Sequence, residues 1–327
     1  MTVTRRGALR LGGLAAMALL APRLARAQGS LPDKPIRLLV PNAAGGVADL
    51  TTRTVGAGLS ERIGRPVVIE NRPGAGGIVA GQALLSSPAD GSTLMVATNA
   101  NAISKSLFRN LPFDPIKDFA PVGLMGTFAI AILVAPNSPI RSAQELIAAL
   151  KKDQRGTNIG TISVGSTQNL AAELFKTTAG VDTVTVPFNG TPALLTSLLR
   201  GDVTAAFEIV APLMGQIKDG SLRAIAVTSS SRAANLPEVP TLQEAGLAGF
   251  DVTSWNAIVA PARAPAPVIE LINRELNAVL AEPAIRAKLL EAGVEAKGDT
   301  PAQLGALLSS EAEKWRAVIE RAGIERQ

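Results

Sequence analysis

The chain has 327 residues, of which 47% are hydrophobic, and it contains no Cys, His or Tyr. This length suffices for two domains that each bury a core. The missing residue types exclude a Ser-His-Asp triad, an ordinary zinc site and any disulfide, which leaves Ser–Lys catalysis, carboxylate pairs and oxygen-ligated metals as possible enzyme chemistries.

Residues 1–27 have the pattern of an export signal. Arg5 and Arg6 lie in a basic start, Leu11–Leu20 is apolar, and Ala25-Arg26-Ala27 ends as A-x-A. This pattern predicts cleavage after Ala27, and the paired arginines favour the twin-arginine route. The segment holds five of the 32 Lys and Arg residues and no acid, so the remaining chain has 27 charges of each sign. The formal charge of +5 therefore gives no support for nucleic-acid binding.

The stretch from Ile36 to Asn101 predicts strands that alternate with helices. The expected strands are Ile36–Val40, Val67–Ile69 and Thr93–Thr98, and the expected helices start near Asp49 and at Ile78. Such alternation indicates parallel βαβ units with right-handed crossovers. The two Gly-rich loops, 41–46 and 71–77, then lie where strands end and helices begin, a position that favours anions. We expect residues 99–117 to form an irregular surface connection.

The middle of the chain repeats this plan. The expected strands are Phe128–Ala135, Asn158–Ser163, Val184–Pro187, Val203–Val210 and Leu222–Thr228. Ser142 and Glu145 predict a capping box, and Thr191 is the expected N-cap of a helix with Pro192 at its first position. Gly180 is expected to close the helix that starts near Ser166.

The last hundred residues are predicted to be mainly helical. A short helix is expected before Gly246, and the segment Asp251–Ala260 is typical of a strand. Three further helices are expected over Ala266–Leu280, Pro283–Ala292 and Thr300–Ala322.

Several of these segments resemble the Bug (TctC-like) solute receptors of tripartite tricarboxylate transporters. The most specific segment is Glu70-Asn71-Arg72-Pro73-Gly74-Ala75-Gly76-Gly77. The resemblance continues through Lys34-Pro35-Ile36, Ala89-Asp90-Gly91, Gly165-Ser166, Val186-Pro187-Phe188-Asn189-Gly190, Leu222–Thr228, Leu236–Thr241, Trp255 and Lys314-Trp315. It covers essentially the whole chain after residue 27.

The resemblance implies an α/β fold, a two-lobed periplasmic-binding-protein clamshell in which each lobe is a mostly parallel sheet flanked by helices. The first lobe would combine residues 28–125 with 228–327, and the second would be 126–227. The implied function is that of a periplasmic solute-binding receptor, not an enzyme. It would capture a small carboxylate-bearing ligand in the cleft and deliver it, as a monomer, to the membrane components of the transporter. No cofactor, metal or nucleic acid is implied.

In this family, carboxylates are held largely by backbone amides, small hydroxyls and ordered waters rather than by an arginine clamp. The loops described above fit that pattern because most contain no basic residue. The expected ligand-binding residues are Asn42, Ala44, Gly45, Gly46, Val47, Asp49, Gly74, Ala75, Gly76, Gly77, Thr98, Asn99, Gly165, Ser166, Thr167, Gln168, Asn169, Phe188, Asn189, Gly190, Thr191 and Glu208.

The chain departs from the family pattern at positions that bear on specificity. Relatives often carry Gly and His where this chain has Gln168 and Asn169, and Tyr-Lys where it has Phe188-Asn189. The acidic residue often found early in a middle-lobe strand is replaced by Thr204. The cleft is therefore expected to be less cationic than a tricarboxylate site, which favours a monocarboxylate, an amino acid or an aromatic acid over citrate.

Structural interpretations compete with several of these assignments. The glycines can simply permit positive φ, and Asp49 can pair with Arg53 at i+4, which is the interpretation we favour. The hydroxyls of Ser166, Thr167 and Thr191 can cap their own helices. Phe188 can be core, Glu208 can bind an amine or face solvent, and the two Trp are expected to be core. Competing functions are an exported hydrolase of Ser–Lys or carboxylate type and a ligand sensor for a membrane signalling partner.

Overall fold

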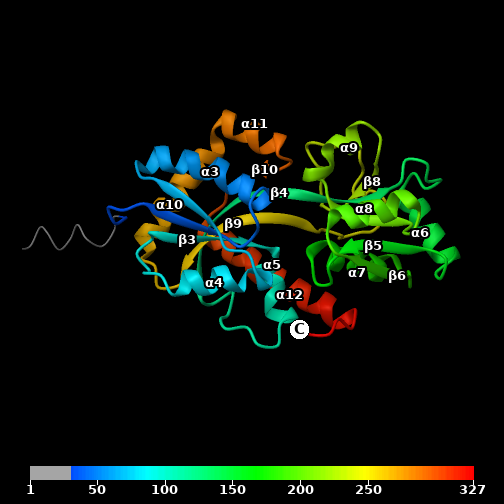
Figure 1. The fold of residues 1–327 in the computed structure, drawn as a ribbon, viewed down its shortest axis with the longest axis horizontal. Helices are drawn as coiled ribbons and strands as arrows, with labels where there is room; N and C mark the ends of the chain where they lie inside the picture. Colours follow the sequence, from blue (N-terminus) through cyan, green and yellow to red (C-terminus); the bar gives the residue numbers. More distant parts are fainter. Residues whose placement is uncertain (1–30) are drawn as a thin grey trace, which may run out of the picture.

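The computed structural model describes residues 31–327, so the predicted export signal over residues 1–27 lies outside the described residues. Figure 1 shows two lobes side by side, joined by long strands that run from one lobe into the other. No helix among the described residues is both long and apolar enough to cross a membrane.

The first lobe begins with the predicted βαβαβ unit. Its elements are β1 (Ile36–Val40), α3 (Val47–Ile63), β2 (Val67–Asn71), a short 3-10 turn (Ala75–Gly77), α4 (Ile78–Leu85) and β3 (Thr93–Thr98). Strand β1 lies between β2 and β3 and is parallel to both, as expected. Helix α3 ends at Gly64, which adopts the left-handed conformation and donates its N–H to the carbonyl of Ser60.

The expected irregular connection over residues 99–117 is wrong for its first half, because α5 (Asn99–Leu107) is a helix, whereas residues 108–117 contain no helix or strand, as expected. The polar residues of α5 suggested a solvent-exposed loop, but most of them are buried and hydrogen-bonded. The Asn101 side chain accepts from the backbone N–H of Thr98 at 2.9 Å, and the Ser104 hydroxyl donates to the carbonyl of Asn101 at 2.8 Å. These contacts accompany a buried apolar face formed by Ala102, Ile103 and Leu107.

Strands β4 (Phe119–Val134) and β9 (Thr253–Pro261) make the sheet mixed rather than mostly parallel. Strand β9 pairs antiparallel with both β3 and β4. With 16 residues, β4 is twice as long as the predicted strand, because it contains Pro121, Gly123 and Gly126, which usually interrupt strands. The α/β clamshell class is confirmed, with an antiparallel centre.

The second lobe extends the same sheet, in the strand order β2-β1-β3-β9-β4-β7-β5-β6. Its elements are α6 (Ala143–Lys152), β5 (Asn158–Ile162), α7 (Thr167–Ala179), β6 (Val184–Phe188), α8 (Thr191–Arg200), β7 (Ala205–Ile209), a 3-10 turn (Ala211–Leu213), α9 (Met214–Lys218) and β8 (Arg223–Val227). Strand β5 is parallel to β6 and β7, whereas β4 is antiparallel to β7 and β8.

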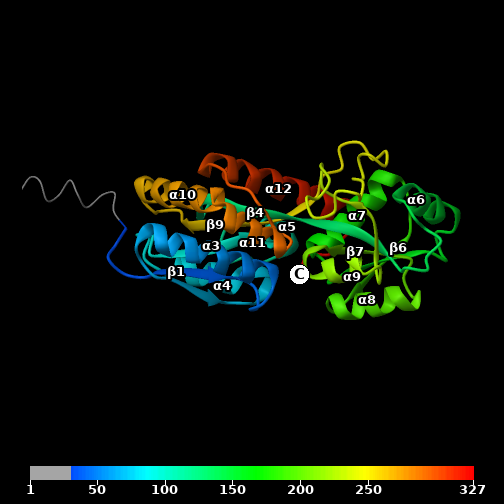
Figure 2. The same ribbon diagram turned by 90° about the horizontal axis from the view of Figure 1, so that it is seen from above.

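The last part of the chain covers the first lobe and reaches toward the second. Its elements are α10 (Ala266–Ala281), α11 (Pro283–Glu291), β10 (Glu295–Ala296) and α12 (Pro301–Arg321). Figure 2 shows α10 and α12 on one side of the molecule and α4 and α8 on the other, with β4 and β9 between them. The helix expected before Gly246 is not formed: residues 242–246 form turns, in which Thr241 and Glu244 exchange two hydrogen bonds.

The chain passes between the lobes along β4 and returns through residues 228–252. The returning segment packs on the second lobe: Leu236 lies in the apolar cluster of α8 and β7, and Leu242 and Phe250 lie in that of α6 and α7. Its end is fixed where the N–H of Val252 donates to the carbonyl of Thr228 at 2.9 Å. This packing favours placing residues 228–252 with the second lobe, and the division into lobes stays a prediction.

Candidate functional site

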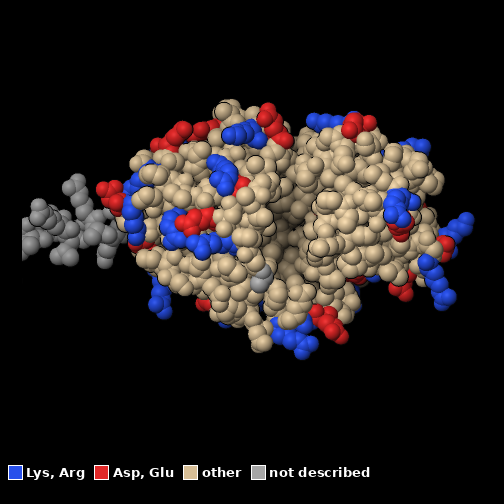
Figure 3. Space-filling view, viewed as in Figure 1, with Lys and Arg blue, Asp and Glu red and all other residues tan. Residues whose placement is uncertain are grey.

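A deep groove separates the two lobes on the side that faces the viewer in Figure 3. The walls of the groove visible there carry neither the blue of Lys and Arg nor the red of Asp and Glu. The loops that end the strands of both lobes lie toward this groove, and the geometry of these loops determines what it can bind.

The first loop joins β1 to α3 and presents exposed backbone. Asn42, Ala44, Gly45 and Gly46 are all exposed, and Val47 is half-buried. Gly46 is the N-cap of α3, so no side chain caps the helix. The first-turn N–H groups of α3 are therefore left without a side-chain acceptor at an end where the helix dipole favours negative charge.

The Asp49 carboxylate holds this loop in place. It accepts hydrogen bonds from the backbone N–H of Gly45 at 2.9 Å, from Nε of Arg53 at 3.0 Å and from Nδ2 of Asn71 at 2.9 Å. Burial opposes its ionisation, but the three hydrogen bonds outweigh burial and lower the pKa of Asp49. The predicted pairing with Arg53 is confirmed, and the carboxylate belongs to the framework of the loop.

The second loop precedes α4 and lies against the first. Gly76 and Gly77 have φ of 61° and 96°, so positive φ, the structural interpretation of these glycines, is confirmed. Gly77 is the N-cap of α4, which again has no side-chain cap. A Cβ at Gly77 would lie 3.5 Å from the side chain of Pro41, so the two Gly-rich loops are neighbours in space.

The loop between β5 and α7 of the second lobe is fixed by its own side chains. Ser166 is the N-cap and accepts from the backbone N–H of Asn169 at 3.1 Å, which confirms the capping interpretation. The Asn169 side chain accepts from the N–H of Gly165 at 3.1 Å and donates to the hydroxyl of Thr161 at 3.2 Å. The side chains of Ser166 and Asn169 are thus engaged within the protein, whereas Thr167 is half-buried beside them.

The Glu208 carboxylate connects the N-terminal ends of α7 and α8. It is 1% exposed and accepts from Nε2 of Gln168 at 2.6 Å, from the hydroxyl of Thr191 at 2.9 Å and from the N–H of Ile209 at 2.7 Å. Burial raises the pKa of Glu208, against the effect of these hydrogen bonds. The solvent-facing position considered from the sequence is wrong, whereas binding of an amine ligand by Glu208 stays a prediction.

The prediction that Thr191 caps α8 is wrong. Gly190 is the N-cap and Thr191 is already helical, because the Thr191 hydroxyl is used by Glu208. Like α3 and α4, helix α8 therefore starts at a glycine without a side-chain cap. Asn189 is exposed beside it, and Phe188 is half-buried and packs on the apolar cluster of α8 and β7.

The predicted residue Asn99 is buried in the packing between β9 and α12. Its side chain accepts from the N–H of Trp255 at 3.0 Å and donates to the carbonyl of Thr253 at 3.2 Å and to Glu311 at 3.3 Å. These bonds occupy the amide group, while the adjacent Thr98 is half-buried.

The end of α5 brings the loops of the two lobes together, a feature that the sequence prediction missed. A Cβ at Gly76 would lie 3.1 Å from the ring of Phe108, and a Cβ at Gly165 would lie 2.5 Å from the side chain of Leu107. No motif marked these two residues, because residues 99–117 were expected to be a loop. Exposed apolar side chains beside the loops were also missed; they are Leu50, Val79 and Val164.

Known proteins resemble this chain over nearly its whole length. A sequence model of the tripartite tricarboxylate transporter family receptor (TctC) matches residues 51–324. BugT of Bordetella pertussis is 31% identical over 294 residues, which cover 89% of this chain and 90% of BugT.

Two solved structures from Rhodopseudomonas palustris have the same fold. Rpa4515 with adipate has a TM-score of 0.79 and 31% identity, and the match covers 91% of this chain and 100% of that one. MatC with bound malate has a TM-score of 0.74 and 28% identity, with 88% and 100% covered. Because the family model spans most of the sequence and the fold agrees, this chain belongs to the TctC family of tripartite tricarboxylate transporter receptors.

Proposed function

We propose that the groove between the lobes captures a small carboxylate-bearing ligand for uptake by a tripartite transporter. One observation carries the proposal: α3, α4 and α8 all begin at a glycine N-cap, with no side chain on their N-terminal N–H groups. A carboxylate at such an end accepts hydrogen bonds from the backbone and interacts favourably with the helix dipole. The adipate and malate bound to the two structural relatives have this chemistry.

The composition of the groove supports a weakly charged ligand. Segments 41–47, 73–79, 163–169 and 188–191 contain no Lys or Arg, and Arg72, the basic residue of loop 71–77, pairs with Glu70 at 3.1 Å. A tricarboxylate would have to leave water without a cationic side chain from these segments to compensate its charges. Exposed Leu50, Val79 and Val164 offer apolar surface beside the loops. We therefore favour a monocarboxylate, an amino acid or an aromatic acid over citrate.

The same proposal includes export and assembly. Cleavage after Ala27 would release residues 28–327 into the periplasm as a monomer, which is supported by the fact that one chain provides both walls of the groove. The partners would be the membrane components of the transporter. The mass of the protein recovered from the periplasm tests the cleavage site, and light scattering tests the monomer.

The decisive experiment is a thermal-shift screen of residues 28–327 against mono-, di- and tricarboxylates, amino acids and aromatic acids. A ligand at a hundred times its dissociation constant adds about 2.7 kcal/mol to the free energy of unfolding. Any hit is then tested on Gly46→Asp and Gly46→Asn. Gly46 has φ −78° and ψ 170°, and a Cβ there meets only one atom within 4 Å, so both variants fit the backbone and both are good N-caps.

The two variants differ only in charge. Gly46→Asp places a carboxylate where we expect that of the ligand and should abolish the shift, whereas Gly46→Asn should weaken it less. If both variants keep the thermal shift, the ligand binds elsewhere. No shift with any anion, from protein shown to carry no co-purified ligand, would refute the proposal.

A further inference from the structure

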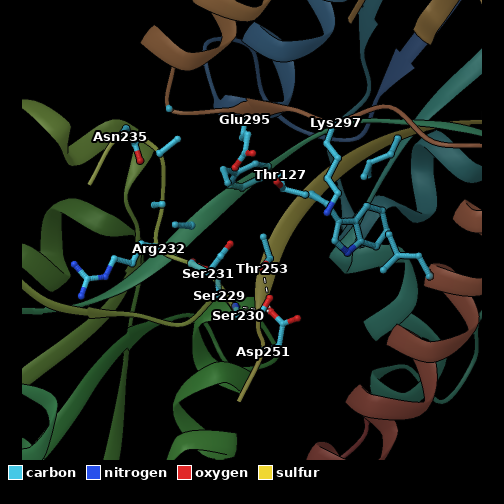
Figure 4. Close-up of a pocket in the computed structure, with 18 of the residues that line it drawn as sticks. Thr127, Ser229, Ser230, Ser231, Arg232, Asn235, Asp251, Thr253, Glu295 and Lys297 are labelled. Carbon is cyan, nitrogen blue, oxygen red and sulfur yellow. Dashed lines mark hydrogen bonds between the residues drawn. The ribbon is translucent and has the colours of Figure 1, made fainter. Parts of the chain in front are cut away.

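A second hollow lies between the lobes, on the opposite side of β4 and β9 from the groove. It has a volume of about 380 Å³, and none of the predicted ligand-binding residues lines it. One wall comes from the turn after α11, from β10 and from α12, and the other from residues 229–235 and Asp251. Figure 4 shows this rear pocket, whose polar lining includes Thr127, Ser231, Asn235, Asp251, Glu295 and Lys297.

Some charges at the rear pocket are already neutralised by the protein. Arg232 pairs with Glu244 at 3.0 Å and points away from the hollow in Figure 4. Lys314 pairs with Glu311, which also accepts from Nε1 of Trp315 at 2.8 Å. These groups therefore offer little free charge to a ligand.

Three other charges face the hollow without an ion-pair partner among residues 31–327. They are Lys297 and Glu295 on the wall formed by the first lobe and Asp251 on the opposite wall. The Asp251 carboxylate accepts from the N–H of Ser230 at 3.1 Å and the hydroxyl of Thr253 at 3.4 Å, and Lys314 donates to the Asp251 backbone carbonyl at 3.3 Å rather than to the carboxylate. The unpaired set consists of one cation and two carboxylates, on two walls that a small molecule could bridge.

Trp255, on β9, adds an unpaired donor to the lining of the rear pocket. Its side chain lines the hollow and is 2% exposed, and its indole N–H has no acceptor among the described residues. Buried polar atoms without a partner are uncommon in native proteins and destabilise them. An oxygen acceptor in the rear pocket would relieve this deficit once the indole can reach it.

We propose that the rear pocket is a second ligand site, specific for a small zwitterion of the α-amino acid class. The carboxylate of the amino acid pairs with Lys297 and the indole N–H, and its ammonium group pairs with Asp251 and Glu295. A simple organic acid would leave both carboxylates unpaired, and a simple amine would leave Lys297 unpaired. The volume lies within the range of small-molecule sites.

The position of the site makes it a regulator of the groove, an inference that rests on the proposed function. Because the crossing strands β4 and β9 lie between the two hollows, a rotation about them that narrows the groove widens the rear pocket. An amino acid that bridges both walls of the rear pocket then opposes closure on a carboxylate. By linkage, the carboxylate weakens binding of the amino acid by the same factor.

The test uses residues 28–327 and calorimetric titration with individual L-amino acids up to millimolar concentrations. Lys297→Met should lower the affinity about tenfold or more, the loss expected for one ion pair of about 1.4 kcal/mol. Lys218→Met is the matched control, because Lys218 is an exposed lysine on α9 away from both hollows. Asp251→Asn is a second variant on the opposite wall, in case Lys297→Met folds poorly. Gly46→Asp blocks the groove and should leave amino-acid binding at the rear pocket unchanged.

The outcomes separate the two proposals. Binding that is lost in Lys297→Met and Asp251→Asn but kept in Lys218→Met and Gly46→Asp supports the rear site. Amino-acid binding that is lost in Gly46→Asp and kept in Lys297→Met overturns it and places the amino acid in the groove. No amino-acid binding at all also overturns it, even where an organic acid binds and the proposed function stands.

Discussion

Replacing Asp49 with alanine should destabilise the first lobe more than replacing Arg53 with methionine, which removes only the ion pair between Asp49 and Arg53. The Asp49 side chain is 3% exposed and ties α3 to both Gly-rich loops, through the N–H of Gly45 and the side chain of Asn71. Asn71 in turn donates to the carbonyl of Asn42 at 3.1 Å. The substitution therefore removes the acceptor shared by the two loops that we expect to hold the ligand.

The magnitude follows from the environment of each bond. Hydrogen bonds to a charged group contribute about 1.5–3 kcal/mol each, but the loop backbone is exposed, so water recovers part of the loss. We expect Asp49→Ala to lower the free energy of unfolding by about 2–3 kcal/mol. The Arg53 side chain is 50% exposed, and an exposed ion pair is worth about 0–1 kcal/mol, so Arg53→Met should cost less than 1 kcal/mol.

Urea denaturation of residues 28–327 measures both values, provided that the dependence on denaturant is unchanged between variants. Ligand binding by Asp49→Ala should also weaken, because the first loop loses its anchor. Equal destabilisation by Asp49→Ala and Arg53→Met would show that the ion pair, not the shared acceptor, is the important interaction. A cost below about 0.5 kcal/mol for Asp49→Ala would refute the argument altogether.

Acid should weaken the native state through Glu70, because a hydrogen bond from Arg37 lowers its pKa to about 2. The contribution of ionised Glu70 to the free energy of unfolding is complete above a pH of about 4.5 and is lost as the pH falls toward 2. In Arg37→Met, the free energy of unfolding should therefore fall less between these pH values, and an unchanged pH dependence would contradict this assignment. Glu208→Gln should have the opposite pH dependence. Burial raises the pKa of Glu208, so the ionised side chain lowers the free energy of unfolding near neutral pH, and the amide should raise it there but not below a pH of about 4.5. A gain that does not depend on pH would argue against an ionised Glu208. Gly293→Ala should push the lobes apart, because its Cβ would lie 2.6 Å from the backbone of Ala211 in the other lobe, at the wall of the rear pocket. An unchanged radius of gyration in small-angle scattering would count against that contact.

Three elements of the first lobe were predicted to the residue. Strand β1, helix α4 and strand β3 have the predicted bounds, because each is a short, largely apolar run with a glycine or proline within two residues of at least one end. Strand β4 was predicted only in part, since its glycines serve packing. A Cβ at Gly123 would lie 2.8 Å from the Asn273 side chain, and a Cβ at Gly126 would lie 2.7 Å from the carbonyl of Glu295. These glycines let α10 and β10 approach the sheet, and a single sequence cannot distinguish such a glycine from a turn.

The loops of the candidate site were predictable from the sequence, but the hydrogen-bond partners of their side chains were not. Periodicity and glycine spacing give the ends of strands and helices, which are local features. Whether Glu208 faces an amine, the solvent or Gln168 depends on contacts between residues 40 positions apart. The same holds for Asn99, whose partners lie more than 150 positions away. Side-chain roles at such positions require the tertiary structure.

The N-caps explain why the groove can be stable and still bind an anion. Glycine in place of Ser or Asn at an N-cap costs only a few tenths of a kcal/mol, so the three glycine-capped helices lose little. What they lack is an acceptor, and α7 shows the contrast, because its N-cap Ser166 supplies one from within the chain. A carboxylate that enters the groove would serve as the missing cap for helices of both lobes at once. Since α3 and α4 belong to one lobe and α8 to the other, that shared cap would favour the closed arrangement, which is how capture of a ligand could be communicated to a transporter.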